Sequence, residues 1–188
     1  NYPRNLSQFS ADQFAEMGEA FLRDTQIHRK LGKPFFIDKM PNNWLHVGLI
    51  RLILPNAKII DVRRHPLACC VANFRQHFAR GQNFSYRLED MGRYYRDYVR
   101  LMDHFDHVDP GAICRVHYEQ VVDDTEAQVR RLLDYLDLPF DPACLRFHET
   151  ERAVRTASSE QVRQPIFREG LDHWRRYAEW IGPLSTLL

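Results

Sequence analysis

Glycine is scarce in this chain of 188 residues, and no two of its eight glycines lie closer together than Gly81 and Gly92. A nucleoside-triphosphate P-loop needs two glycines five positions apart, and the nucleophile elbow of serine hydrolases needs two that are four apart. Both motifs are therefore excluded. The nine histidines form no H-E-x-x-H motif, and no two of them are spaced four apart, so we expect no bound metal.

An excess of one charge is also lacking. The 26 lysines and arginines nearly balance the 25 aspartates and glutamates, and the formal net charge is +1. This balance argues against a nucleic-acid partner, because such partners favour a strongly basic surface. No apolar run approaches the ~20 residues that a membrane span needs. We therefore expect neither nucleic acid nor membrane as a partner, and any anion-binding site must be local.

The four cysteines include no C-x-x-C pair, which argues against a zinc ribbon or a thioredoxin-like redox motif. The adjacent Cys69 and Cys70 lie in an apolar run, which indicates buried packing. We read this usage as that of a reducing compartment and predict a cytoplasmic protein. The start at Asn1 has no initiator methionine and no signal-peptide pattern, so we expect a trimmed chain.

The chain does contain an alternation of short apolar runs and amphipathic stretches. The apolar runs predict buried strands at 34–38, 58–62 and 112–117. Helices are predicted over about 10–31, 44–54, 66–79, 88–105, 124–136, 141–150 and 171–181. Strands that alternate with helices predict an α/β fold with a parallel sheet flanked by helices. The length suits one domain.

Residues at the expected helix ends support this assignment. Ser10 precedes Gln13 by three positions, as in a capping box, and Asp124 is placed to cap the helix that follows it. Pro66 suits a first helical turn, where its missing N–H costs nothing. Over 88–105, apolar and aromatic residues recur every three or four positions, which predicts a stripe that faces the core rather than a cofactor site.

In such a fold, ligands bind beyond the carboxyl ends of the parallel strands. Loops at 39–42, 63–66 and 118–119 follow the three predicted strands, so we expect all three to face one crevice. Lys39 would bring a point charge to that crevice, where it could contact a transferring group. The alternative is a solvated loop lysine.

The strongest local signal is the run Asp61-Val62-Arg63-Arg64-His65-Pro66. A helix that begins at Pro66 offers free N–H groups, and a guanidinium next to it adds a fork of donors suited to phosphate. This combination predicts a phosphate cradle. The alternative is that both arginines pair with surface carboxylates. A polar segment at 155–163 could line the same crevice, or its Ser-Ser-Glu-Gln part could be only a capping box.

Four segments together resemble the PAPS-dependent sulfotransferases, which move a sulfuryl group from 3′-phosphoadenosine 5′-phosphosulfate (PAPS) to a hydroxyl. They are DKMPNNWLHVGLIRLILPNAKIIDVRRHPLACCVANF, VHYEQVVDDTEAQVRRLLDYLDLPFDPACLRF, RTASSEQVRQPI and LDHWRRYAEWIGPL. They cover about residues 34–184 in the family's order. The resemblance is strongest to bacterial members that carry N-terminal tetratricopeptide repeats and are related to tyrosylprotein sulfotransferases. It implies a three-layer parallel sheet and a cytoplasmic bacterial protein.

The resemblance also implies site roles. Arg64 matches the arginine that holds the 3′-phosphate of PAPS. The family's second phosphate contact, a serine, is replaced here by Ala72, and Asn73 is the nearest substitute. Lys39 matches the lysine that meets the sulfuryl group and the leaving phosphate oxygen. Tyr118 matches a tyrosine near the nucleotide.

Further matches lie toward the C-terminus. Ser158 matches a serine that bonds the phosphosulfate, and Gln161, Val162 and Arg163 would lie along the adenosine and the 3′-phosphate. His173 takes the place of a basic residue before the terminal tryptophan. The resemblance therefore implies that Lys39 and Ser158 are catalytic, whereas the other matched residues bind the nucleotide. No metal is required.

Two parts of the family pattern are absent. There is no G-x-P-R-S-G-T-T loop for the 5′-phosphosulfate, and no counterpart of the catalytic glutamate that follows this loop in tyrosylprotein-type members. The resemblance thus implies that residues 1–188 are the C-terminal part of a single sulfotransferase domain. We expect an N-terminal segment of the same protein to supply the general base and to be a required partner.

Two functions remain open at this point. The first is sulfuryl transfer from PAPS to an acceptor hydroxyl on a small molecule, a glycan or a protein tyrosine, with acceptor contacts expected from the loop 82–87. The second is a non-catalytic module on a degenerate sulfotransferase fold, which would bind a nucleotide or a protein partner. Ala72, His173 and the absent loop count toward the second, but the four matching segments in order favour the first.

Overall fold

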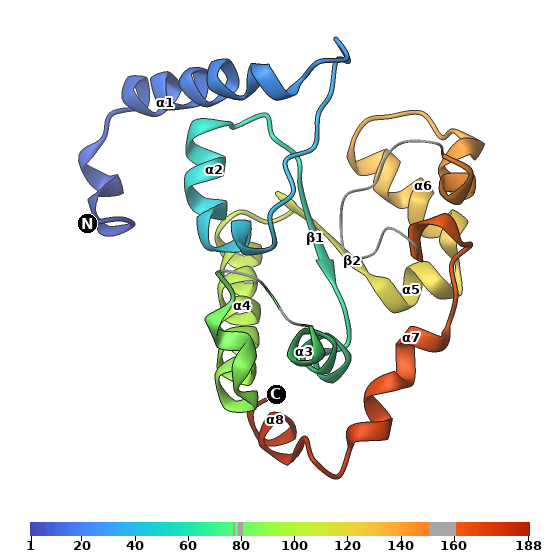
Figure 1. Ribbon diagram of the computed structural model, residues 1–188. Coiled ribbons are helices and arrows are strands. Elements are labelled where there is room, and N and C mark those ends of the chain that lie inside the picture. The colour runs from blue at the N-terminus through green and yellow to red at the C-terminus, as the bar shows by residue number, and fades with distance from the viewer. Residues whose placement is uncertain (77, 79–80, 151–160) are drawn as a thin grey trace.

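The computed structural model describes residues 1–76, 78, 81–150 and 161–188. Its centre is a parallel pair of strands, β1 (Ile59–Arg63) and β2 (Ile113–His117). The register aligns Ile59 with Ile113 and Arg63 with His117, so both strands end at the same edge. Two of the three predicted strands are confirmed. Strand β1 leads to α3 (Pro66–Arg75), and β2 leads to α5 (Tyr118–Asp123), as Figure 1 shows.

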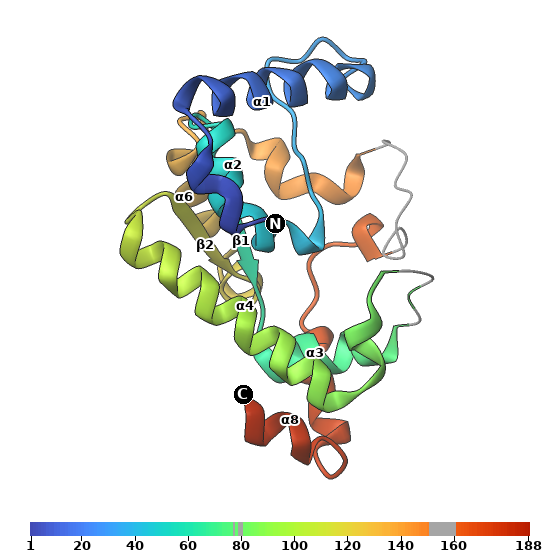
Figure 2. The ribbon, with the colours of Figure 1, turned by 90° about the vertical axis from the view of Figure 1, so that its left-hand side faces the viewer.

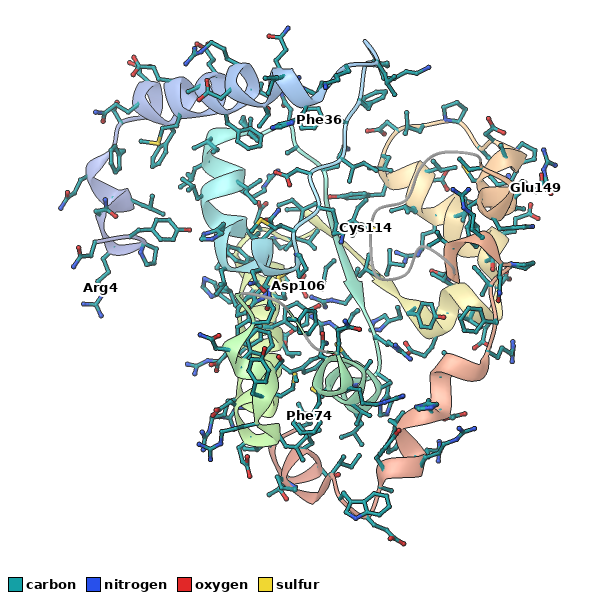
Figure 3. The ribbon with its side chains drawn as sticks, viewed as in Figure 1. Arg4, Phe36, Phe74, Asp106, Cys114 and Glu149 are labelled. Atoms are coloured by element: carbon teal, nitrogen blue, oxygen red, sulfur yellow. The ribbon has the colours of Figure 1, made fainter. Side chains whose placement is uncertain are left out.

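The strand predicted at 34–38 is wrong. These residues form an irregular segment, and the side chains of Phe35 and Ile37 are 69% and 91% exposed. An apolar run becomes a strand only when a neighbouring backbone accepts and donates its hydrogen bonds. In the described part of the chain, β1 and β2 pair only with each other. Phe36 marks this segment, beyond α1, in Figure 3.

The N-terminal third contains η1 (Arg4–Gln8), α1 (Ala11–Asp24), η2 (Thr25–His28), η3 (Pro41–His46) and α2 (Val47–Ile53). The predicted capping box is confirmed: the Gln13 N–H donates to the Ser10 hydroxyl, and the Ser10 N–H donates to the Gln13 side chain. The helix ends earlier than predicted. The Thr25 hydroxyl donates to the Phe21 carbonyl at 2.6 Å, which competes with continued helix at this position.

Gly18 allows α1 to lie directly against the end of α2. A Cβ atom on Gly18 would be 1.9 Å from the Ile53 carbonyl oxygen, and this oxygen belongs to a backbone that cannot rotate away. We therefore expect Gly18→Ala to lower the free energy of unfolding by about 1–3 kcal/mol, as overpacking does. Urea denaturation measures the change. Gly182→Ala is the control, since its Cβ would meet nothing within 4 Å; an equally stable Gly18→Ala variant would contradict this close approach.

The long helix α4 (Leu88–Val108) runs beside the strands, and α6 (Thr125–Tyr135) lies beyond them (Figures 1 and 2). The core stripe predicted for α4 is confirmed, because Met91, Tyr95 and Met102 are buried. The main core cluster joins α3, α4 and the C-terminal segment; its buried members are Cys70, Val71, Met91, Tyr95, Ile181 and Leu184. Asp124 caps α6 as predicted, accepting from the Ala127 N–H at 3.0 Å.

The remaining elements are short. They are η4 (Asn83–Tyr86), η5 (Pro142–Glu149), η6 (Gln161–Arg163), α7 (Glu169–Asp172), η7 (His173–Tyr177) and α8 (Gly182–Leu187). The single helix predicted over 171–181 is therefore wrong. Ile181 leaves the helical region, with φ −100° and ψ 20°, and α8 then begins at Gly182 with Pro183 in its first turn, where the missing N–H costs nothing. The predicted helix 66–79 likewise ends at Arg75, where Gln76 becomes extended and its N–H bonds to the Asn73 carbonyl.

The described residues form a helix-rich α/β structure around a small parallel sheet, so the α/β class is confirmed in this coarse form. None of the described helices is both long enough and apolar enough to cross a membrane. Within the same residues, no three His, Cys, Asp or Glu side chains gather where they could hold a metal ion.

Candidate functional site

The carboxyl ends of β1 and β2 open into a cavity of about 510 Å³. Its walls include Arg63, Arg64 and His65 after β1, and His117 and Glu119 after β2. Parallel strands place their carboxyl ends together, which is why residues separated by more than 50 positions meet here. The predicted loop at 118–119 is wrong in detail, since Tyr118 already begins α5; the buried Val122 anchors this helix directly behind the strand.

The two adjacent arginines have different surroundings. Arg63 is committed to the interior: its Nη2 donates to Asp61 Oδ2 at 3.2 Å, its Nε donates to the Tyr98 hydroxyl at 3.2 Å, and its guanidinium lies 5.0 Å from the Tyr98 ring centre. Asp61 is buried. The ion-pair alternative therefore holds for Arg63, although its partner is a buried carboxylate rather than a surface one.

Arg115 of β2 completes this buried network. Its Nε donates to Asp61 Oδ2 at 3.1 Å, and its Nη1 pairs with Asp106 Oδ2 at 2.8 Å. Asp106 belongs to α4 and is labelled in Figure 3. The Tyr98 hydroxyl donates to Asp61 Oδ1, and burial together with this carboxylate raises the pKa of Tyr98. The network thus ties β1, β2 and α4 together directly behind the cavity.

Arg64 has no such partner. Its guanidinium lies 5.3 Å from the Tyr118 ring centre and donates to the Gly170 carbonyl, while its buried Nε has no hydrogen-bond acceptor. Across the described ranges, no carboxylate lies within ion-pair distance of Arg64. A half-buried cation without a counter-ion, held on an aromatic ring, is suited to binding an anion.

The first turn of α3 follows Arg64 directly, and its N-cap amide is bonded to a carboxylate. Pro66 occupies that turn as predicted. The His65 N–H donates to Glu119 Oε1 at 2.8 Å, and the His65 ring stacks on Trp174 with ring centres 5.0 Å apart. Glu119, in the first turn of α5 just after β2, therefore holds the start of α3 in place. Sequence reasoning did not single out Glu119 or Trp174 for this role, because the stacking and the bond exist only after the strands pair.

His173 lies in the same region, as the resemblance implied. Arg75 Nη1 donates to His173 Nδ1 at 2.9 Å, and the guanidinium carbon of Arg75 lies 5.4 Å from the Tyr177 ring centre. Desolvation, followed by the charges of Arg75, Arg176 and Arg64, lowers the pKa of His173. Sequence reasoning missed Arg75. Its position one helical turn after Ala72 was the available signal, because residues three apart share a helix face.

Asn73 is turned toward its own helix. Its side-chain nitrogen donates to the Cys69 carbonyl at 3.0 Å and lies 3.5 Å from Cys69 Sγ. Burial raises the pKa of Cys69 even though Arg64 lies near enough to oppose the shift. The predicted packing of the cysteine pair is confirmed for the buried Cys70, whereas Cys69 is half-buried.

The other predicted residues are not joined to this region by any described contact. Lys39 is exposed on the irregular segment before η3 and does not line the cavity. Ser158 lies outside the described residues, as does the side chain of Gln161. Val162 is half-buried in η6, and Arg163 donates to the Thr150 carbonyl. The structure therefore brings together Arg64, Tyr118 and His173 from the predicted set.

The described fold is that of an α/β protein in which Arg64, without a carboxylate partner among the described residues, lies at the ends of two parallel strands. The model of the sulfotransferase family matches residues 4–142, which is well over half of the chain. The chain therefore belongs to the sulfotransferase family.

The names of two relatives from Caenorhabditis agree with this assignment. An uncharacterized protein of Aquifex aeolicus is 35% identical over 158 residues, which are 82% of this chain and 21% of that protein. Two putative protein-tyrosine sulfotransferases, from Caenorhabditis elegans and Caenorhabditis briggsae, are each 24% identical. The matches cover 90% of this chain in both cases, and 68% and 62% of the relatives. This chain thus spans only part of the length of each relative.

Proposed function

We propose that this chain is the nucleotide-binding part of a sulfotransferase that moves a sulfuryl group from PAPS to an acceptor hydroxyl. The observation that carries the proposal is Arg64: a cation with no carboxylate partner among the described residues, seated on Tyr118 at the start of α3 and close enough to affect His173. A guanidinium, a helix N-terminus and an aromatic ring together suit a phosphorylated adenosine nucleotide.

In this scheme Arg64 anchors the 3′-phosphate, and Arg75 and His173 add positive charge beside it. Because the Asn73 amide already donates within α3, we infer that Arg75 replaces the missing serine contact at Ala72. Tyr118 supports the Arg64 guanidinium. The segment that contains Gln161, Val162 and Arg163 lies along the adenosine.

Lys39 and Ser158 act at the reacting end. The acceptor oxygen forms a bond to sulfur while the bond from sulfur to the leaving phosphate oxygen breaks, and the acceptor proton passes to a general base. Negative charge grows on the leaving phosphate, so catalysis depends on positioning and on donors aimed at that charge. Lys39 and Ser158 supply those donors. The scheme requires no metal.

We also propose that residues 1–188 work with a further segment of the protein, which supplies the phosphosulfate loop and the general base. Parallel sheets are normally covered on both faces and extend over several strands. Here Val62 of β1 is 68% exposed, and Phe35 and Ile37 are more so. These apolar surfaces support a larger three-layer sheet in the whole protein. The names of the two Caenorhabditis relatives, putative protein-tyrosine sulfotransferases, favour a protein tyrosine as the acceptor.

Calorimetric titration with adenosine 3′,5′-bisphosphate tests the proposal on this chain. We expect binding, and weaker binding of adenosine 5′-monophosphate, because only the bisphosphate carries the group that Arg64 anchors. Absence of bisphosphate binding would count against the proposed function. If the nucleotide binds but labelled PAPS transfers nothing when the whole protein is supplied with hydroxyl acceptors, the non-catalytic alternative holds.

The pH dependence of binding provides a second measurement. The pKa of His173 is lowered, so its imidazole is mostly neutral near pH 7 in the free chain. A bound phosphate favours the charged form and raises that pKa, so binding takes up a proton. Affinity for the bisphosphate should therefore rise several-fold from about pH 8 to about pH 6.5. His173→Gln should lose this rise, whereas His28→Gln, exposed on η2 after α1, should keep it; a rise of equal size in His173→Gln would refute the assignment.

A further inference from the structure

Four aromatic side chains form a connected cluster along α4, which we call the aromatic clamp: Trp44, Phe84, Tyr94 and Tyr98. Trp44 of η3 meets the Tyr94 and Tyr98 rings edge-on, with ring centres 5.2 Å and 5.7 Å apart. Phe84 of η4 stacks on the other side of Tyr94, with ring centres 3.7 Å apart and ring planes at 8°. The clamp therefore holds η3 and η4 against the same face of α4.

One contact of the clamp is polar. The Tyr94 hydroxyl donates to Asn42 Oδ1 at 2.8 Å, in a partly buried position. Burial raises the pKa of Tyr94, so its hydroxyl remains protonated and able to donate at neutral pH. Packing alone does not require a hydroxyl at this position. The bond instead fixes Asn42, which lies in the first turn of η3, three residues after Lys39 at the end of the preceding loop.

The same helix is bonded to the end of β1. Within one turn of Tyr94, the Tyr95 hydroxyl donates to the Arg64 carbonyl at 2.9 Å, and the Tyr98 hydroxyl donates to the buried Asp61. Helix α4 has 21 residues and an unbroken hydrogen-bond ladder in this region, so it acts as a rigid bar. One face of α4 thus holds both the loop that follows Lys39 and the strand end that carries Arg64.

We propose that Tyr94 is a positioning residue that sets the Lys39 loop relative to the Arg64 strand end, with Trp44 and Phe84 fixing the orientation of its ring. The proposal rests on the proposed function, in which Arg64 anchors the 3′-phosphate and Lys39 meets the other end of the nucleotide. A nucleotide that is held at one end presents its phosphosulfate correctly only if the second contact lies at a fixed distance.

Tyr94→Phe tests the proposal, because it removes one hydroxyl and keeps the ring. Amide hydrogen exchange of residues 40–46 should become about fivefold faster, as expected for the loss of one ordinary hydrogen bond. Tyr135→Phe is the matched control: its hydroxyl donates to the Ala112 carbonyl at 2.7 Å, at the opposite ends of the strands, and its loss should leave the loop unchanged. Asn42→Ala should reproduce the faster exchange, and the double variant should add nothing further.

The second readout separates positioning from nucleotide affinity. Bound adenosine 3′,5′-bisphosphate should slow the acetylation of Lys39 by acetic anhydride in the unmodified chain and in Tyr135→Phe. In Tyr94→Phe this protection should fall several-fold while the dissociation constant stays nearly constant. If Tyr94→Phe shows the same amide exchange over residues 40–46 and the same protection of Lys39 as Tyr135→Phe, the positioning role is overturned. Absence of nucleotide binding to the unmodified chain would overturn the proposed function, and loop exchange alone would then decide whether Tyr94 holds the loop.

Discussion

Replacing Arg64 with alanine is expected to weaken the binding of adenosine 3′,5′-bisphosphate by about 10- to 100-fold, which corresponds to the loss of charge-assisted hydrogen bonds worth about 1.5–3 kcal/mol. In the described residues Arg64 pairs with no carboxylate, so its charge is not already neutralised by the protein. Removing it deprives the phosphate of its central donor. Isothermal titration calorimetry measures the change directly.

The controls for this prediction lie on the same chain. Arg93→Ala removes a cation that is exposed on α4 and paired with Asp90 at 3.2 Å, and it should leave the affinity unchanged. Arg64→Lys keeps the charge but loses the planar fork of donors, so its affinity should fall between those of the unmodified chain and the alanine variant. If Arg93→Ala and Arg64→Ala lose affinity for the bisphosphate equally, the nucleotide is attracted by positive charge in general. If Arg64→Ala keeps its affinity, Arg64 does not anchor the phosphate.

Replacing Asp61 with alanine is expected to lower the free energy of unfolding by about 3–5 kcal/mol, the range found when one partner of a buried ion pair is removed. Asp61 is buried and accepts from Arg63, Arg115 and Tyr98. Without it, two arginines remain in the interior, and within the described residues only Arg115 keeps further carboxylate partners, Asp103 and Asp106 of α4. Urea denaturation followed by circular dichroism measures the loss.

Glu126→Ala provides the comparison for Asp61→Ala. Glu126 pairs with Arg130 at 2.6 Å on the exposed face of α6, so the loss should be about 0.3–0.5 kcal/mol. Asp61→Asn keeps an acceptor but removes the charge, and its loss should lie between those of the two alanine variants. An Asp61→Ala variant as stable as Glu126→Ala would show that the network contributes little.

Local sequence signals predicted the elements whose stability is set within a few residues. The caps at Ser10 and Asp124 depend on neighbours three positions away, the first turn at Pro66 depends on the missing N–H of that proline, and the structure confirms all three. The stripe over 88–105 was also correct, because helical periodicity alone decides which face is apolar. Predictions over 34–38 and 171–181 were wrong, because pairing and turning there depend on residues outside the segment.

The sequence by itself determined that an arginine pair precedes a proline-led helix after an apolar strand, and together with three further segments in the same order this run indicated the sulfotransferase family. Strand periodicity placed Arg63 on the side of Asp61 and Arg64 on the opposite side, but it did not show which of the two arginines is buried. The tertiary structure decided between them: Asp61, Tyr98 and Arg115 engage Arg63 in the interior, and Arg64 is left without a carboxylate in the described part of the chain. Asp61 comes from the same strand as Arg63, but the burial of this pair depends on Tyr98 of α4 and Arg115 of β2, and spacing along the chain does not encode that arrangement.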